Sequence, residues 1–318
     1  MKGKGPLRIG DMVRRKSYDE DLLFMIVDIG YGRRGEKIAF LRGLNFRLLA
    51  DAPISDLVLA DEKYVMDFKR QVMKESHEHM RQVKQRRLVE EQTRKKRSRR
   101  QQGLSLSYDG YELPGKILHI DSDPEYLKDC LMYYRELKVP SVGEYVKVEE
   151  QPDRVTQLLE MHNPDILVLT GHDSLRKNGD RMSLDSYKTS RFFVDAVKKA
   201  RRYESDKDGL VIIAGACQSF YEAILEAGAN FASSPDRVLI QCYDPVLVAE
   251  KISHTPIDEV VRVEEVINNT ITKKAGVGGM ETRGKLRLVM PNTFNKALSL
   301  NEVKIFRGKK DISVDKLQ

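Results

Sequence analysis

Two unbroken apolar runs, at residues 166–169 and 210–214, constrain the fold of this chain most strongly. Runs of four or five apolar residues between turn signals are typical of strands buried on both faces, as in a parallel sheet. Other strand-like segments lie at 116–120, 145–148 and 237–241. Helix-like segments alternate with them, at 124–138, 153–162, 188–203, 220–227 and 245–252. This alternation predicts an α/β fold with a doubly wound, mostly parallel sheet over about residues 113–272.

The N-terminal part of the chain has a different pattern. Short apolar segments with turn signals between them predict strands at 8–14, 22–29, 37–41 and 46–49. The glycine-rich stretch at 30–35 predicts a hairpin connection. We therefore expect a small SH3-like β-barrel over 1–60, a basic helix and linker over 61–112, and the α/β domain over 113–318.

The charge of the chain is concentrated in one segment. Residues 61–102 contain 14 Lys/Arg and 7 Asp/Glu, which accounts for the whole net charge of +7. This segment lacks Pro and Gly and predicts a long, mostly exposed helix, which ends in six basic residues among the seven at 94–100. Because the rest of the chain is neutral, nucleic-acid binding is not expected as a general function.

Several protein classes are excluded by simple counts. No apolar run approaches the ~20 residues that span a bilayer, so we expect no membrane segment. No apolar core follows the first residues, so a cleaved secretion signal is not expected. Three cysteines without a Cys-x-x-Cys spacing indicate a reducing compartment and no structural zinc site. We expect no metal and no cofactor.

Candidate catalytic residues follow the two apolar runs. Thr170-Gly171-His172-Asp173 follows the first, and Gly215-Ala216-Cys217-Gln218-Ser219 follows the second. Carboxyl ends of parallel strands meet at one edge of a sheet, so His172 and Cys217 are expected at the same edge. We expect Cys217 at the start of a helix, where backbone N–H groups favour the thiolate and hold an oxyanion. A cysteine nucleophile and a histidine acid or base predict acyl-transfer chemistry.

Rival residues leave other functions open. Cys130 is expected in the core, whereas Cys242 is a weaker rival nucleophile and His254 is a rival to His172. If Cys217 worked with His254, the chain would be a hydrolase that resembles glutamine amidotransferases. A non-enzymatic alternative is a coat-scaffold or nucleic-acid-binding protein that uses the barrel and the basic helix.

The Gly-His and Ala-Cys strand ends resemble those of caspase-like cysteine peptidases, the clan of caspases, clostripain and gingipains. More closely, the chain resembles the YabG family of sporulation-specific proteases of endospore-forming bacteria. That resemblance runs from Gly10-Asp11-Met12-Val13 through the basic helix to the His172 and Cys217 motifs.

The resemblance implies a cysteine endopeptidase that cuts spore coat and cortex-associated proteins after arginine. It would act in the mother cell cytoplasm and become associated with the spore coat. Cys217 would be the nucleophile and His172 the general acid and base, with the oxyanion held by N–H groups near Cys217, Gly171 and Asp173. The clan usually has Gly after the histidine, where this chain has Asp173.

Arginine specificity has two further consequences for this sequence. The guanidinium of a substrate needs a carboxylate partner, and the candidates at strand ends are Asp121, Asp123 and Asp244. The basic run offers the enzyme a substrate within its own chain. We therefore predict self-cleavage between the barrel and the α/β domain, at Arg94, Arg97, Arg99 or Arg100.

Overall fold

The computed structural model describes residues 6–32, 35–102, 111–289, 305–307 and 310–312. Within these ranges, the side chains of residues 95, 97–102, 305–307 and 310–312 lie outside the description. The chain divides into two compact units, Met1–Arg81 and Gln82–Gln318. The boundary lies inside a long helix, so we describe each unit by itself.

The first unit is built on a five-stranded antiparallel sheet with the strand order β4-β3-β2-β1-β5. Its strands are β1 (Met12–Arg15), β2 (Phe24–Tyr31), β3 (Lys37–Gly43), β4 (Leu49–Pro53) and β5 (Leu57–Leu59), with short 3₁₀ turns at Lys16–Tyr18 and Ile54–Asp56. Its core contains alternate residues of these strands, such as Val13, Ile26 and Leu41. The predicted hairpin is confirmed, since Tyr31 pairs with Lys37 across it.

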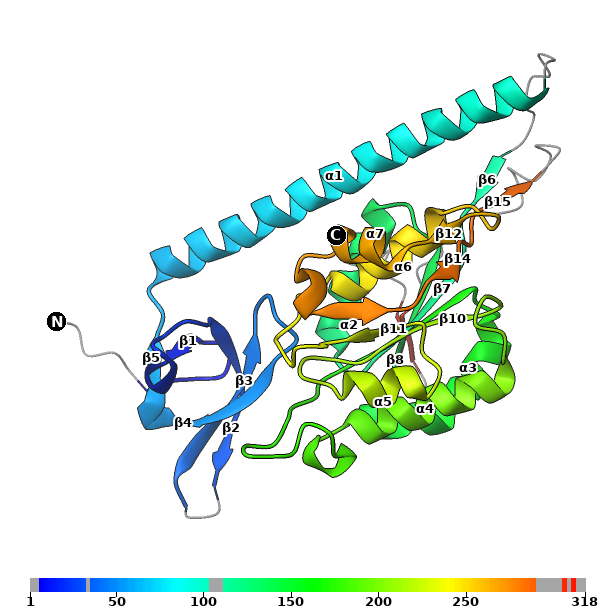
Figure 1. Ribbon diagram of the computed structural model, residues 1–318. Helices are drawn as coiled ribbons and strands as arrows, with labels where there is room; N and C mark the ends of the chain where they lie inside the picture. Colours follow the sequence, from blue (N-terminus) through cyan, green and yellow to red (C-terminus); the bar gives the residue numbers. More distant parts are fainter. Residues whose placement is uncertain (1–5, 33–34, 103–110, 290–304, 308–309, 313–318) are drawn as a thin grey trace. The chain divides into compact units, whose positions relative to one another are not determined.

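Helix α1 (Glu62–Gln102) confirms the predicted long helix (Figure 1). Its first turn is capped by Asp61, whose Oδ1 accepts a hydrogen bond from the N–H of Lys63 at 2.9 Å. Most of its described side chains are exposed or half-buried, as a sequence without a wide apolar stripe predicts.

The second unit contains an eight-stranded sheet in the order β13-β11-β10-β9-β7-β8-β16-β17. The strands are β7 (Ile117–Asp121), β8 (Ser141–Tyr145), β9 (Ile166–Thr170), β10 (Val211–Ala214), β11 (Phe231–Ser233), β13 (Val277–Gly279), β16 (Ile305–Arg307) and β17 (Lys310–Ile312). The five strands from β8 to β11 are parallel, and β16 continues this direction beside β8. The doubly wound, mostly parallel sheet is therefore confirmed.

Helices cover both faces of this sheet (Figure 1). One face carries α3 (Gln151–His162), α4 (Ser190–Tyr203) and α5 (Tyr221–Glu226), and the other carries α2 (Pro124–Glu136), α6 (Asp244–His254) and α7 (Val263–Asn269). Three 3₁₀ turns lie at Val148–Glu150, Leu184–Ser186 and Lys273–Ala275. Two small sheets pair β6 (Tyr111–Leu113) with β15 (Arg287–Val289), and β12 (Val260–Val261) with β14 (Thr282–Arg283).

The chain order across the sheet creates a switch point. Strand β8 lies on one side of β7 and β9 lies on the other, so the connections leave β7 and β9 in opposite directions. In open parallel sheets, ligands bind beyond the carboxyl ends of the strands at such a point. The carboxyl ends of β7, β9 and β10 are therefore where a functional site is expected.

Two sequence expectations are wrong in detail. Residues 237–241 do not form a sheet strand, and the fifth parallel strand is β11 (Phe231–Ser233), which lies earlier in the chain. The residues at 238–240 are apolar, as in a buried strand, and Ile240 is indeed buried. However, this segment crosses over the end of the sheet and does not pair within it. The expected strand at 145–148 lies earlier too, at Ser141–Tyr145.

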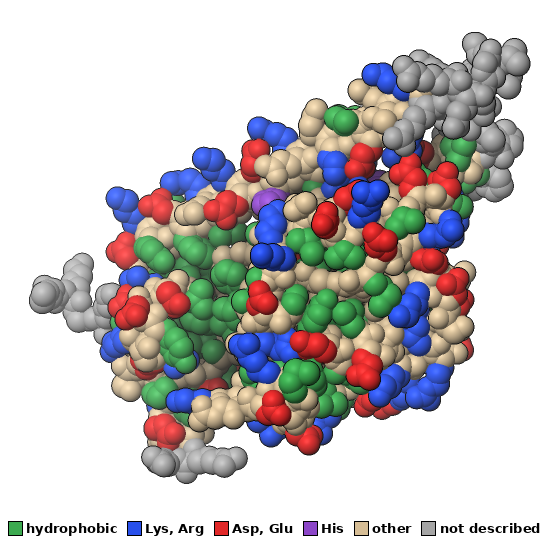
Figure 2. All heavy atoms as spheres, viewed as in Figure 1, with side chains coloured by type: hydrophobic (Ala, Val, Ile, Leu, Met, Phe, Trp, Pro, Cys, Tyr) green, Lys and Arg blue, Asp and Glu red, His purple; other side chains and the backbone are tan. Residues whose placement is uncertain are grey.

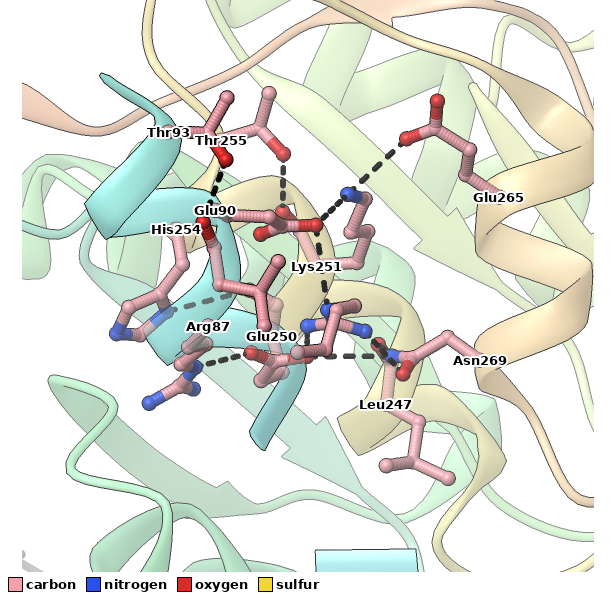
Figure 3. Close-up of polar contacts among 12 residues, drawn as sticks. Arg87, Glu90, Thr93, Leu247, Glu250, Lys251, His254, Thr255, Glu265 and Asn269 are labelled. Carbon is pink, nitrogen blue, oxygen red and sulfur yellow. Dashed lines mark hydrogen bonds and ion pairs between the residues drawn. The ribbon is translucent and has the colours of Figure 1, made fainter. Parts of the chain in front are cut away.

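A cluster of ion pairs around the buried residues Glu250 and Lys251 attaches the second half of α1 to α6 (Figure 3). The carboxylate of Glu250 has no exposed surface and pairs with Arg86 at 2.6 Å and with Arg87. Lys251 on the same helix pairs with Glu90 of α1 at 2.9 Å and with Glu265 of α7 at 3.0 Å. Burial raises the pKa of Glu250, but the two arginines outweigh it and hold that pKa at about 2.

Candidate active site

Three neighbouring strands place His172, Cys217 and Asp123 at one edge of the sheet. Leu169 of β9 pairs with Ala214 of β10. His172 lies three residues after Leu169, and Cys217 lies three residues after Ala214. In the ladder between β7 and β9, Asp121 pairs with Thr170. Asp123 and His172 therefore each lie two residues beyond this pair.

The backbone turns sharply just before Cys217. Gly215 has φ +113°, which side chains rarely allow, and a Cβ there would meet Ser233 at 3.2 Å. The Gly215 N–H still donates to the carbonyl of Leu169 at 3.0 Å, so the sheet pairing continues into the turn. The Ser219 hydroxyl accepts a hydrogen bond from the N–H of Ala216 at 2.9 Å and closes the turn.

The expectation that Cys217 starts a helix is wrong. Helix α5 begins at Tyr221, four residues later, and Cys217 lies in the turn that precedes it. Gln218 has φ +57°, and its N–H donates to Ser234 Oγ at 3.0 Å rather than into a helical pattern. The dipole of α5 therefore does not begin at the sulfur, and thiolate formation must depend on other groups.

The sulfur of Cys217 is fully buried. The backbone N–H of Ile240 donates to Sγ at 3.2 Å, and the carbonyl of Ile240 lies 3.9 Å from Sγ. Ile240, in the segment 237–241 expected as a strand, therefore lies against the candidate nucleophile. Because the sulfur is fully buried, a peptide substrate can reach it only if surrounding residues move.

His172 is held from one side by a carboxylate. Its Nε2 lies 3.0 Å from Oδ2 of Asp123, and the two side chains are 16% and 9% exposed. The ring of Tyr126, in the first turn of α2, packs against the imidazole with centroids 5.8 Å apart. The second ring nitrogen, Nδ1, is buried and has no hydrogen-bond partner in the described part of the chain.

The start of α4 braces the loop that carries His172. The Thr189 hydroxyl donates to the carbonyl of His172 at 2.6 Å, and the Thr189 N–H donates to Oδ1 of Asp173 at 2.8 Å. Ser190 donates to Oδ2 of Asp173 and accepts from the N–H of Phe220 at 2.7 Å. Burial raises the pKa of Asp173. Ser190 thus links the histidine loop to the chain that follows Cys217.

The carboxylates expected in an arginine pocket have internal partners instead. Asp121 has no exposed surface and accepts hydrogen bonds from the Thr170 hydroxyl at 2.8 Å and the Asp123 N–H at 2.9 Å. Asp123 contacts His172, as described above. Asp244 is buried and accepts the N–H of Ile271 at 2.6 Å, and burial raises its pKa. Each of the three carboxylates therefore already has a hydrogen-bond partner within the protein.

The rival histidine, His254, lies away from Cys217. Ser253, next to His254, exchanges hydrogen bonds with Gly115, two residues before β7 begins. His254 is therefore at the amino edge of the sheet, opposite to Cys217, and burial lowers its pKa to about 4. The hypothesis that His254 assists Cys217 is not supported by this geometry. Cys130 is buried as expected, and its thiol donates to the carbonyl of Cys242, which is also buried.

The structure describes the basic run in part. Arg94 pairs with Glu112 at 2.8 Å, and the helix backbone continues through the run to Gln102. The side chains of Arg97, Arg99 and Arg100 lie outside the description. Acidic and basic side chains are interspersed over the face of the second unit that is in view in Figure 2.

Sequence reasoning missed the contact between Asp123 and His172. The sequence does predict the position of Asp123, because an aspartate before Pro124 is typical of a helix N-cap. In the structure Asp123 accepts hydrogen bonds from the N–H groups of Glu125 and Tyr126. The contact with His172 needs the strand order, which puts β7 beside β9.

In the residues that the structure describes, no group of three His, Cys, Asp or Glu side chains is placed to hold a metal ion, and no helix is long and apolar enough to span a membrane.

Comparison with known proteins gives two matches and one negative result. The family model described as YabG peptidase U57 matches residues 8–291. The sporulation-specific protease YabG of Bacillus subtilis (strain 168) is 41% identical over 293 residues, which cover 91% of this chain and 99% of that protein. No solved structure matches the chain.

Proposed function

The chain belongs to the YabG peptidase family, and on that premise we propose that it is a cysteine endopeptidase with Cys217 as nucleophile and His172 as general acid and base. The observation that carries this proposal is the register of β9 and β10, which brings His172 and Cys217 to the same level of one sheet edge. The burial of both strands gives that edge a rigid support.

The proposed reaction has two halves. His172 takes the proton of the Cys217 thiol, and Sγ attacks the carbonyl carbon of the scissile bond; the oxygen that becomes negative is held by backbone N–H groups near Cys217, Gly171 and Asp173. His172 then gives that proton to the nitrogen of the leaving amine as the C–N bond breaks, which leaves a thioester. Water then attacks the thioester while His172 accepts one of its protons. The C–S bond breaks, His172 returns that proton to the sulfur, and the carboxylic acid and the free thiol are released.

The proposal extends to substrates. We propose cleavage after arginine in proteins of the spore coat and cortex, by an enzyme of the mother cell that becomes associated with the coat. A caspase-like arrangement of the α/β domain and an SH3-like closure of the first sheet belong to the same proposal. For the arginine of the substrate, Asp121, Asp123 and Asp244 are the carboxylates that the sequence suggests, and each would have to exchange an internal partner for the guanidinium.

Peptide cleavage tests the reaction class and its residues together. Wild-type protein and the Cys217→Ala, His172→Ala, His254→Ala and Cys242→Ala variants are incubated with an arginine-containing peptide library, and products are read by mass spectrometry. We expect kcat/KM to fall by about 10⁴-fold or more for Cys217→Ala. His254→Ala and Cys242→Ala serve as controls and should cut at near the wild-type rate. Cleavage by Cys217→Ala at the wild-type rate would reject the proposal.

Self-cleavage in the basic run is a separate part of the proposal. Proteases bind extended chain, so the end of α1 must unwind before it can be cut. Helix ends fray first, so sites near Gln102, such as Arg99 and Arg100, need less unwinding than Arg94, which also pairs with Glu112. Intact-mass analysis of the wild type beside Cys217→Ala should show new termini only in the wild type, with Arg99 and Arg100 cut before Arg94.

A further inference from the structure

The carboxylate of Asp123 has two tasks at once. Oδ1 accepts hydrogen bonds from the N–H groups of Glu125 at 3.0 Å and Tyr126 at 3.1 Å, which fixes the carboxylate to the first turn of α2. Oδ2 lies 3.0 Å from Nε2 of His172. A capping residue needs only one oxygen, so the cap does not explain why the second oxygen meets the imidazole.

We propose that Asp123 is the positioning residue of the catalytic histidine: it fixes the His172 ring and its tautomer, so that Nδ1 is the nitrogen that exchanges protons with the substrate. This inference rests on the proposed peptidase function and adds a third member to the site. The sequence alone suggests Asp123 for the arginine pocket, whereas in the structure its carboxylate contacts His172.

The first support is the contrast between the two ring nitrogens. A histidine nitrogen that faces a carboxylate carries the proton, which leaves the opposite nitrogen as the acceptor in the neutral ring. Nδ1 of His172 is buried and has no hydrogen-bond partner in the described part of the chain. A buried polar atom without a partner needs an explanation, and a reacting group that arrives with the substrate supplies one.

The second support is the state of the carboxylate. Burial raises the pKa of Asp123, but hydrogen bonds from His172 and from the N–H of Tyr126 outweigh burial and hold the pKa below its usual range. Asp123 is therefore ionised at neutral pH. It accepts a hydrogen bond from the imidazole and stabilises the imidazolium that forms when Nδ1 takes a proton.

The third support is the rigidity behind the pair. The N–H of Asp123 donates to Oδ1 of Asp121, and the Thr170 hydroxyl donates to the other oxygen of Asp121 at 2.8 Å. Asp121 and Thr170 are paired residues of β7 and β9, the two strands at the switch point. The side chains that hold His172 are thus fixed by the sheet itself, and the ring of Tyr126 limits rotation of the imidazole.

Kinetics of two substitutions test the role of the carboxylate. Asp123→Ser keeps a side-chain acceptor for the α2 cap and removes the oxygen at His172, whereas Asp123→Asn keeps the size but places an amide there. We expect kcat to fall by roughly 10²-fold in both, with KM for an arginine peptide changed less than twofold. Asp153→Ser is the matched control, since Asp153 lies in the first turn of α3 and pairs with Lys199 at an exposed position.

The tautomer of His172 gives a readout that is independent of activity. Long-range ¹H–¹⁵N spectra of histidine-labelled Cys217→Ala protein report which ring nitrogen carries the proton, and His172→Gln identifies the signal among the six histidines. We expect the Nε2–H form in Cys217→Ala, and a mixture of tautomers once Asp123→Ser is added.

The outcomes separate this inference from the function on which it rests. If Cys217→Ala is inactive but both Asp123 variants keep the wild-type kcat and tautomer, the positioning role is rejected and the peptidase stands. If Cys217→Ala cuts peptides normally, the proposed function itself has failed. If Asp123→Ser loses kcat only because it unfolds, its tautomer spectrum and melting temperature will both differ from those of Asp123→Asn. The kcat of Asp123→Asn then decides, and a wild-type kcat in that variant rejects the positioning role.

Discussion

Asp123 and Glu250 are two buried carboxylates of the same unit, and they are held in opposite ways. Glu250 receives two arginines, Arg86 and Arg87, which compensate its charge inside the protein. Asp123 receives two backbone N–H groups and one histidine, whose other nitrogen has no hydrogen-bond partner in the described residues. A carboxylate with charged partners on several sides is suited to joining helices. A carboxylate that holds a single imidazole is suited to positioning that imidazole for a reaction. Substitutions at Glu250 should therefore change stability, and substitutions at Asp123 should change turnover.

The largest effect is expected at Glu250. Glu250→Ala leaves Arg86 and Arg87 partly buried without their counter-charge, and breaking such a cluster costs about 3–5 kcal/mol of unfolding free energy. Urea unfolding measures this loss. Glu265→Ala is the control, because Glu265 is half exposed and its pair with Lys251 should contribute less than about 1 kcal/mol. Equal losses in the two variants would contradict a special role for the buried carboxylate.

If self-cleavage occurs as proposed, we expect the same cluster to hold the two fragments together. A cut at Arg97, Arg99 or Arg100 leaves Arg86, Arg87 and Glu90 on one fragment and their α6 partners on the other. We expect the two fragments of cleaved wild-type protein to co-elute in size-exclusion chromatography, and those of Glu250→Ala to separate. Fragments of the wild type that separate freely would show that these contacts are too weak to hold the cut helix.

We expect the free energy of unfolding to fall by about 3 kcal/mol as the pH is lowered from 6.5 to 4. Burial and the nearby Arg87 lower the pKa of His254 from 6.5 to about 4, so the unfolded chain takes up a proton between pH 6.5 and 4 that the folded chain does not. Stability contributed by neutral His254 is therefore complete above pH 6.5 and is lost as pH falls through this window. Glu250, with a pKa lowered from 4.5 to about 2, adds a second loss below pH 4.5. Urea midpoints from pH 7.5 to 4 should fall for the wild type and fall less for His254→Asn.

The smallest effect separates the two tasks of Asp123. Asp123→Ala removes the cap of α2 as well as the contact with His172, whereas Asp123→Ser keeps an acceptor for the cap. We expect Asp123→Ala to be about 1 kcal/mol less stable than Asp123→Ser, with the same kcat. Thermal unfolding and peptide assays on both proteins measure the two quantities. A further loss of kcat in Asp123→Ala would mean that helix position, rather than the carboxylate, controls the histidine.

The sequence predicts the layout of the second unit well and its loops less well. The apolar runs at 166–169 and 210–214 identify the central strands, because strands buried on both faces need such runs. The run at 238–240 is equally apolar, yet it crosses above Cys217, because burial by a turn and burial by a sheet select the same residue types. Strand β11 has only three residues and its pairing depends on tertiary contacts, so local pattern does not reveal it.

Local sequence pattern also identifies only some of the residues in the candidate site. His172 and Cys217 can be selected from sequence because each follows a predicted strand. The role of Asp123 cannot, because its local signal is complete as a helix cap and its second contact depends on which strands are neighbours. The helix expected at 220–227 is present as α5, which begins at Tyr221. The expectation that Cys217 starts this helix is wrong, because Gln218 donates its N–H to Ser234 and Val238 instead of entering a helical turn.

The amide of Ile240 above the Cys217 sulfur also affects how this thiol can be studied. A thiol without exposed surface offers no approach to peroxide or to alkylating reagents, whatever its intrinsic nucleophilicity. The rate at which iodoacetamide labels Cys217 would therefore measure how often the residues around this sulfur open. If Cys217 is the nucleophile as proposed, peptides that accelerate the labelling would be candidate substrates.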